Sequence, residues 1–194
     1  GMRTVEELLK LAPDLYQITV FGAEPHGNYN RILMSPVLAG EMSLDEIMIN
    51  TEQWYEDNAI TLLKGKEVVK IDRLKRVVTA ADGTEAPYDR LLLATGSDPI
   101  ILPVSGVDLP GVVPFRNILD VEAILGATEP GNKAVVIGGG LLGLEAAHGL
   151  MKQGMDVTVI HLMETLMERQ LDEVAGDMLC ASLEKRGLTV IRSA

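Results

Sequence analysis

The chain has 194 residues, enough for one or two domains with a buried core, and its 47% hydrophobic content indicates an ordered globular protein. A formal net charge of −11 disfavours nucleic acids and anionic membranes as partners. No apolar run approaches the ~20 residues of a membrane span and no secretory signal opens the sequence, so a cytoplasmic protein is expected. The single cysteine, Cys180, excludes a disulfide, a C-x-x-C redox pair and a four-thiolate iron–sulfur cluster within these residues, and no metal site is predicted.

The first half of the sequence predicts one β-α-β unit without its first strand, into which a small antiparallel meander is inserted. The chain is therefore expected to begin after the first strand of a Rossmann half. The predicted elements are a helix over residues 4–11 and strands over 17–21, 61–63, 68–72, 76–81 and 84–86, with Asp82-Gly83 as the turn between the last two.

Three further features of this half bear on the fold. Ser43 and Glu46 have the spacing of a capping box, which predicts a helix that carries the Trp54-Tyr55 pair. Residues 91–94 have the continuous apolar character of a strand buried on both faces. The proline- and glycine-rich residues 97–111 that follow indicate a crossover between domains.

A glycine-rich turn organises the second half. An apolar run at residues 134–137 leads into Gly138, Gly140 and Gly143, which have the G-x-G-x-x-G spacing, and a helix is expected directly after the turn. Gly138 permits the tight turn, Gly140 lets the backbone approach a pyrophosphate, and Gly143 allows the helix to pack closely on the sheet. Because free N–H groups and the positive end of the helix dipole would face the phosphates, the pattern predicts a dinucleotide site.

The second half as a whole has a β-α-β-α-β pattern, which is half of a doubly wound sheet. Cys180 lies in its last helix and is interpreted as a packed residue without chemistry. The predicted fold class is therefore α/β, with two Rossmann-like parallel-sheet units, both incomplete, and a small antiparallel β-meander. The expected elements are a helix over 120–125 with Asp120 as its N-cap, a strand over 134–138, a helix over 141–153, a strand over 156–160, a helix over 172–186 and a strand over 188–191.

The order of these motifs resembles that of flavoprotein reductases with tandem FAD and NAD(P)H domains. Ala94-Thr95-Gly96 stands where that class has an A-T-G motif before the inserted nicotinamide domain. The finer resemblance is to the FAD/NAD(P)H-binding region in the large subunits of NAD(P)H-dependent assimilatory nitrite reductases. It is carried by residues 28–41, 138–147 and 161–172, and the last stretch is the most specific because nucleotide binding in general does not require it.

The resemblance implies an electron-entry module, in which NAD(P)H gives a hydride to FAD and electrons pass on singly to siroheme and an iron–sulfur cluster in C-terminal redox domains outside these residues. It implies a partial FAD-binding domain over residues 1–114, lacking its first strand, and a partial NAD(P)H-binding domain over 115–194. Because both sheets are incomplete, weak or absent FAD binding and homodimers paired through exposed sheet edges are expected. Two alternatives remain open: a ferredoxin- or rubredoxin-reductase-like flavoprotein, and a catalytically inactive truncated chain that at most binds nucleotide.

For the nicotinamide nucleotide, the residue that ends the second strand selects between NAD and NADP in such folds. Here that residue is His161, which is neither an acid nor an arginine. Glu164 is a substitute acceptor for the ribose, whereas Arg169 either meets a 2′-phosphate or forms only a surface salt bridge, and the expectation is NADH. The full set of predicted contacts is Gly138, Gly139, Gly140, Leu141, Leu142, Gly143, His161, Glu164 and Arg169.

For the flavin, the resemblance implies contacts from loops at strand ends. Glu145 matches an acidic position near the nicotinamide–flavin contact and is the candidate catalytic residue. Relatives often pair that acid with a lysine after Leu-Ser, but here Ser35 is followed by Pro36, so a solvated helix carboxylate is the other interpretation. The predicted FAD contacts are Glu24, Arg31, Ser35, Ala94, Thr95 and Gly96.

Overall fold

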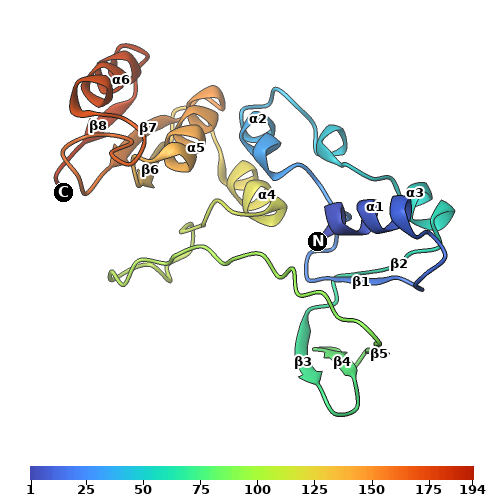
Figure 1. Cartoon of the computed structure of the whole chain (residues 1–194). Helices are drawn as coiled ribbons and strands as arrows, with labels where there is room; N and C mark the ends of the chain where they lie inside the picture. Colours follow the sequence, from blue (N-terminus) through green and yellow to red (C-terminus); the bar gives the residue numbers. More distant parts are fainter. The chain divides into compact units, whose positions relative to one another are not determined.

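A computed structural model of the chain describes every residue, Gly1–Ala194, and divides into two compact units (Figure 1). The first unit comprises Gly1–Asn30 and Met48–Ser97, and the second comprises Arg31–Ile47 and Asp98–Ala194. The chain therefore passes from one unit to the other three times. The predicted assignment of residues 1–114 to FAD and 115–194 to NAD(P)H divides the chain differently, and it stays a prediction about cofactors.

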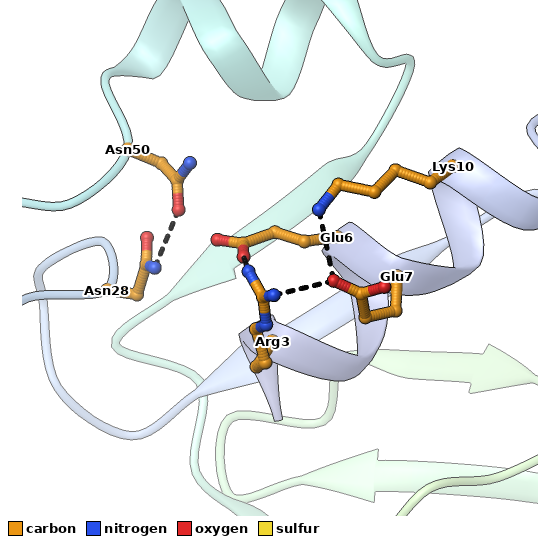
Figure 2. A network of polar contacts seen from close by, with 6 residues as sticks. All are labelled: Arg3, Glu6, Glu7, Lys10, Asn28 and Asn50. Carbon is orange, nitrogen blue, oxygen red and sulfur yellow. Dashed lines mark hydrogen bonds and ion pairs between the residues drawn. The ribbon is translucent and has the colours of Figure 1, made fainter.

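The first unit contains a two-stranded parallel sheet. Its strands are β1, Thr19–Gly22, and β2, Thr61–Lys64, and Thr19 lies opposite Thr61. The unit also contains α1, Met2–Leu11, and α3, Glu52–Asp57. The exposed side of α1 carries a ladder of ion pairs, in which Arg3 Nη2 lies 2.7 Å from Glu7 Oε1 and Lys10 Nζ lies 3.0 Å from the same oxygen (Figure 2). Such exposed pairs stabilise a helix only by a few tenths of a kcal/mol each.

An antiparallel meander is the second sheet of the first unit. Its strands are β3, Val68–Asp72, β4, Val77–Ala80, and β5, Glu85–Pro87, in the order β3-β4-β5. The predicted meander is confirmed. Lys66 and Asp82 form an ion pair beside the turn that joins β4 to β5.

Two predictions about this half of the chain are wrong. The Ser43 N–H and hydroxyl both donate to Glu46 Oε2 at 2.7 Å, which is the glutamate half of a capping box, but the pair leads only into the 3₁₀ turn Asp45–Ile47. The helix that carries Tyr55 begins separately, with the Thr51 hydroxyl accepting from the Trp54 N–H at 3.2 Å. A capping box satisfies the first N–H groups of a turn, but the following residues decide whether that turn continues.

The predicted strand over residues 91–94 is also wrong. These residues have no regular secondary structure, and 57% of Leu92 and 65% of Leu93 are exposed. The strands of this unit pair only with one another, as β1-β2 and β3-β4-β5, so this run has no partner strand. An apolar run indicates burial on both faces only where neighbouring strands are present.

The second unit is a parallel α/β layer. Its three-stranded sheet has the order β6-β7-β8, with β6 at Lys133–Ile137, β7 at Asp156–Ile160 and β8 at Thr189–Ile191. The helices α5, Leu141–Lys152, and α6, Glu173–Lys185, connect these strands, so the predicted β-α-β-α-β pattern is confirmed. The expected N-cap of α4, Ile118–Ala127, is wrong by three residues: the Asn117 side chain accepts from the Asp120 N–H, and the Asp120 carboxylate accepts from the Asn117 N–H.

The core of the second unit lies between α5 and the sheet. It consists of small and branched apolar residues: Ala147, Leu150, Val157, Val159 and Leu188. Burying each such branched side chain contributes about 1.5–3 kcal/mol. No helix of the chain combines the length and the apolar character needed to cross a membrane.

The short helix α2, Met34–Leu38, follows the 3₁₀ turn Arg31–Leu33 and packs on α5. An ideal Cβ on Gly149 would lie 2.6 Å from Leu38 Cγ, so a glycine is needed for this close approach. The Gln153 side-chain amide donates to the Leu38 carbonyl at 2.8 Å. Segments more than a hundred residues apart in the sequence are thus joined in one unit.

Candidate nucleotide-binding site

The turn between β6 and α5 has the geometry that its glycines predict. Gly138 has a φ of +116°, a conformation that favours glycine, and its N–H donates to the Ile160 carbonyl at 2.8 Å. Gly140 is the extended N-cap of α5, and no side chain caps the helix there. The first N–H groups of α5 are therefore available to an anion.

Gly143 is required because the helix starts against the turn itself. An ideal Cβ on Gly143 would lie 1.9 Å from the Gly138 carbonyl oxygen, and a backbone atom cannot rotate away as a side chain can. An ideal Cβ on Gly140, in contrast, meets no atom within 4 Å. The same motif thus combines one closed glycine position with one open position, and this combination fits a pyrophosphate that approaches the backbone at Gly140.

The residue between them, Gly139, is held by the segment that follows β7. Its N–H donates to His161 Nδ1 at 3.0 Å, and its carbonyl accepts from the Met167 N–H at 3.0 Å. An ideal Cβ on Gly139 would lie 2.4 Å from Leu166 Cδ2, and Leu166 has no exposed surface. The turn is thus fixed from the side of residues 161–167.

His161 lies where the sequence places it, at the end of β7, but its ring points inward. The residue is 7% exposed, and its Nε2 lies 3.1 Å from the Thr165 carbonyl oxygen and 3.2 Å from Glu168 Oε2. Both ring nitrogens therefore have partners within the protein. Sequence reasoning missed Thr165, Leu166 and Met167 as contributors to the site, although the specificity of the 161–172 stretch was a signal for them.

The remaining residues predicted for the nicotinamide nucleotide lie at the surface. Leu141 and Leu142 are about half exposed in the first turn of α5. Glu164 and Arg169 are exposed in the segment after β7. Arg192, which the sequence did not single out, donates to the Glu164 carbonyl at 2.8 Å, and its hydrogen bond to Asp177 raises the pKa of the Arg192 guanidinium.

Glu145, the candidate catalytic residue, has a partner that the sequence analysis did not foresee. The Ser35 hydroxyl on α2 donates to Glu145 Oε2 on α5 at 2.6 Å. Both side chains line a hollow of about 410 Å³, whose surface is largely formed by apolar residues such as Leu141 and Leu144. A serine thus contacts the carboxylate for which the resemblance implied a lysine partner.

The residues predicted to bind FAD are divided between the two units. In the second unit, Ser35 is bonded to Glu145, and Arg31 Nη1 donates to the Arg116 carbonyl oxygen. The other four lie in the first unit: Glu24, Ala94, Thr95 and Gly96.

Within the first unit, Glu24 accepts from the Tyr29 hydroxyl at 2.6 Å, and residues 94–96 are exposed. The ideal Cβ of Gly1, which is the N-cap of α1, lies 3.1 Å from Ala94 Cβ. Ala94 therefore lies beside the N-terminus of a ten-residue helix, which is compatible with a phosphate of the flavin nucleotide there.

Comparison with known proteins identifies the family of the chain. The family described as pyridine nucleotide-disulphide oxidoreductase matches residues 1–194. The chain belongs to that family. Within it, the chain is 54% identical over 192 residues to a nitrite reductase [NAD(P)H] of Bacillus subtilis, and 48% identical over 191 residues to an assimilatory nitrate reductase electron transfer subunit of the same organism.

Each of these two alignments covers 98% of this chain. They cover only 24% and 25% of the two relatives, so the chain spans about a quarter of the length of the curated relatives it matches. The predicted resemblance to nitrite reductase large subunits is confirmed.

The fold of this chain also matches solved structures. A NAD-dependent persulfide reductase from A. fulgidus superposes with a TM-score of 0.91 at 27% identity, covering 100% of this chain and 38% of that one. A covalent putidaredoxin reductase–putidaredoxin complex superposes with a TM-score of 0.87 at 29% identity, covering 100% and 47% respectively. The predicted α/β class with parallel sheets and a small antiparallel sheet is confirmed.

Proposed function

We propose that the second unit binds a nicotinamide dinucleotide at the turn 138–143, and that the whole chain is the NAD(P)H- and FAD-binding part of a nitrite reductase. The observation that carries the proposal is the pairing of Gly143, which leaves no room for a side chain, with Gly140, which faces open space. A turn that served only to reverse the chain would explain the glycine at position 143, but it would give no reason for a glycine at position 140.

In this proposal the backbone of the chain does most of the binding. The N–H groups at the start of α5 hold the pyrophosphate, and the dipole of that helix favours the negative charge. When bound there, the nicotinamide would supply hydride chemistry, and a flavin would supply the conversion from two-electron to one-electron transfer. Siroheme and an iron–sulfur cluster are proposed to receive the electrons in C-terminal redox domains outside these residues.

Glu145 and Ser35 are proposed to act at the nicotinamide end of the site. Their 2.6 Å hydrogen bond holds the carboxylate on the wall of the hollow beside the first turns of α5. Glu164 is proposed to accept from the adenosine ribose, which favours NADH, because a carboxylate repels the 2′-phosphate of NADPH. Arg169 is the competing residue that would favour NADPH.

Calorimetric titration with NADH, NADPH and ADP-ribose tests the proposal. We expect NADH and ADP-ribose to bind with similar affinity, since the pyrophosphate and adenosine supply the contacts, and NADPH to bind more weakly. Glu164→Gln should reduce the preference for NADH, while Met178→Ala on the exposed side of α6 serves as the control. Absence of binding by all three nucleotides would overturn the proposal.

The flavin is proposed to bind weakly to this chain, with Glu24, Ala94, Thr95 and Gly96 as its contacts in the first unit. The support is the position of Ala94 beside the N-terminus of α1 and the exposure of residues 94–96. Purified protein that is yellow and releases stoichiometric flavin on denaturation would contradict weak binding.

A reductase of the ferredoxin or rubredoxin type is the second candidate. It is supported by 36% identity over 172 residues to a rhodocoxin reductase of Rhodococcus erythropolis, of which the chain covers 40%. The two candidates differ in the electron acceptor, so NADH-dependent reduction of a ferredoxin or rubredoxin by the full-length protein, without nitrite reduction, would favour the second. A chain that binds NADH but transfers no electrons would favour an inactive nucleotide-binding fragment.

The cytoplasmic location and the homodimer stay predictions. The homodimer is proposed to form through the free edges of the parallel sheets, whose outer strands expose unpaired backbone groups. Light scattering after size exclusion measures the molar mass, and a monomer at all concentrations would contradict the dimer.

A further inference from the structure

We propose that His161 is a positioning residue that holds the glycine turn open for the nucleotide through its Nε2–H tautomer, acting on Gly139 without contacting the ligand. The proposal rests on the dinucleotide function of the turn. It assigns a role to the 161–172 stretch, which the G-x-G-x-x-G motif by itself does not need.

The first observation is the burial of the ring. His161 is the single polar residue among the buried side chains of the chain, at 7% exposed. Its Nδ1 accepts from the Gly139 N–H at 3.0 Å, and Gly139 is itself buried. A buried backbone N–H without a partner is costly, so this contact determines which way the Gly139 peptide faces.

The second observation is that Gly139 is held on both sides of its peptide. While His161 accepts from its N–H, its carbonyl accepts from the Met167 N–H at 3.0 Å. The segment 161–167, which contains His161 and Met167, packs in turn against α6. The contact is close: an ideal Cβ on Gly176 of α6 would lie 2.1 Å from Thr165 Cγ2. Residues 161–167 therefore form a brace between α6 and the turn.

The third observation concerns the proton on the ring. Since Nδ1 accepts from a backbone N–H, it carries no proton, and the neutral ring must be protonated at Nε2. This Nε2–H then donates to the Thr165 carbonyl at 3.1 Å, with Glu168 Oε2 at 3.2 Å as the second acceptor. One ring thus joins the turn to the brace, and this requires a single tautomer.

The burial of the His161 ring affects the choice between NADH and NADPH. A side chain whose two nitrogens are both occupied inside the protein is not available to an adenosine ribose. The choice between NADH and NADPH therefore moves from the strand-end residue to the exposed segment that follows it, where Glu164 lies.

The tautomer can be measured directly in the wild-type protein without nucleotide. Imidazole ¹⁵N correlation spectra should show His161 with a protonated Nε2 and a bare Nδ1, while the exposed His148 averages between forms and serves as the internal reference. A proton on Nδ1 of His161, or averaging like that of His148, would overturn the proposal.

Two substitutions test the function of the ring. His161→Asn retains an oxygen acceptor at the position of Nδ1, whereas His161→Leu removes it and leaves the Gly139 N–H without a partner. We expect His161→Leu to weaken NADH binding about tenfold and to speed hydrogen exchange at the Gly139 amide by a similar factor, with His161→Asn within about threefold of wild type in both. Met178→Ala is the control for a distant side-chain truncation.

The outcomes separate the brace from the proposed function. A folded His161→Leu protein with wild-type NADH affinity and wild-type Gly139 exchange would overturn the positioning role. If the wild type does not bind NADH, the proposed function fails. The His161 tautomer and the Gly139 exchange rate still test whether His161 holds the turn. If His161→Leu does not fold, the wild-type tautomer and the His161→Asn protein carry the test.

Discussion

The segments 134–143 and 91–97 are alike in sequence and differ in structure. In each, an apolar run precedes a glycine with positive φ: residues 134–137 precede Gly138, with φ of +116°, and residues 91–94 precede Gly96, with φ of +74°. The first leaves a strand paired with β7 and enters a helix, and the second follows unpaired and exposed residues. A glycine motif thus becomes a defined site where paired strands and a helix fix its backbone on both sides.

The largest expected effect comes from Gly143→Ala. The added methyl group would lie 1.9 Å from the Gly138 carbonyl oxygen, so α5 must move off the turn. We expect a loss of about 3 kcal/mol in the free energy of unfolding, together with loss of NADH binding. Chemical denaturation and calorimetry measure both. Wild-type stability in this variant would mean that the closed packing at Gly143 does not exist.

Gly140→Ala is the matched variant in the same turn. An ideal Cβ there meets no protein atom within 4 Å, so we expect the free energy of unfolding to fall by less than about 1 kcal/mol. NADH affinity should nevertheless fall about tenfold, because the methyl group would occupy the face at which we propose that the pyrophosphate binds. Equal loss of stability in both variants would remove the distinction between the closed and the open glycine.

Gly96→Ala tests the other region. The substitution puts a side chain on a backbone with φ of +74°, but the surroundings are open and can relax. We expect a cost of about 1–2 kcal/mol, smaller than that of Gly143→Ala, and unchanged NADH binding. A loss as large as that of Gly143→Ala would indicate that residues 91–97 pack as tightly as the predicted strand required.

The thiol of Cys180 reports on packing in the second unit. Burial raises the pKa of this thiol, and the thiolate is the reactive form. We expect a thiol reagent at pH 8 to modify it at least about tenfold more slowly in the folded protein than in denaturant. Equal rates would show that α6 opens readily.

The smallest expected effect is at the meander of the first unit. Hydrogen bonds from Lys66 and from Thr84 lower the pKa of Asp82 from 3.8 to about 2. Because this pKa is lower in the folded state than in the unfolded state, the Asp82 carboxylate stabilises the fold above pH 3.8. That contribution is lost as the pH falls through about 2. Lys66→Met should raise the midpoint in an NMR titration of the Asp82 carboxyl, and an unchanged midpoint would contradict the ion pair.

How far the sequence predicted the molecule depends on whether local or distant residues decide each feature. The strands Val68–Asp72 and Asp156–Ile160 were predicted to the residue, since apolar runs with clear turn signals define them. The glycine turn was predictable because the spacing of Gly138, Gly140 and Gly143 is itself the pattern that this backbone conformation requires. The N-cap of α4 was misplaced because Asn117 and Asp120 both satisfy the same local pattern.

The features that the sequence did not predict depend on distant contacts. The direction of the His161 ring is set by Gly139, 22 residues away, and the Ser35–Glu145 hydrogen bond joins positions 110 residues apart. The apolar run at residues 91–94 carries a strand pattern, but its exposure depends on which strands lie beside it. None of these can be obtained from a local window of sequence.

The close approach of Leu38 to Gly149 has a practical consequence for dissecting the protein. Because α2 lies before the meander in the sequence but covers α5, a contiguous recombinant piece starting at Asp98 would expose the surface around Gly149 and lose the acceptor of Gln153. A fragment that keeps the whole second unit has to be built by circular permutation or by grafting Arg31–Ile47 onto Asp98–Ala194.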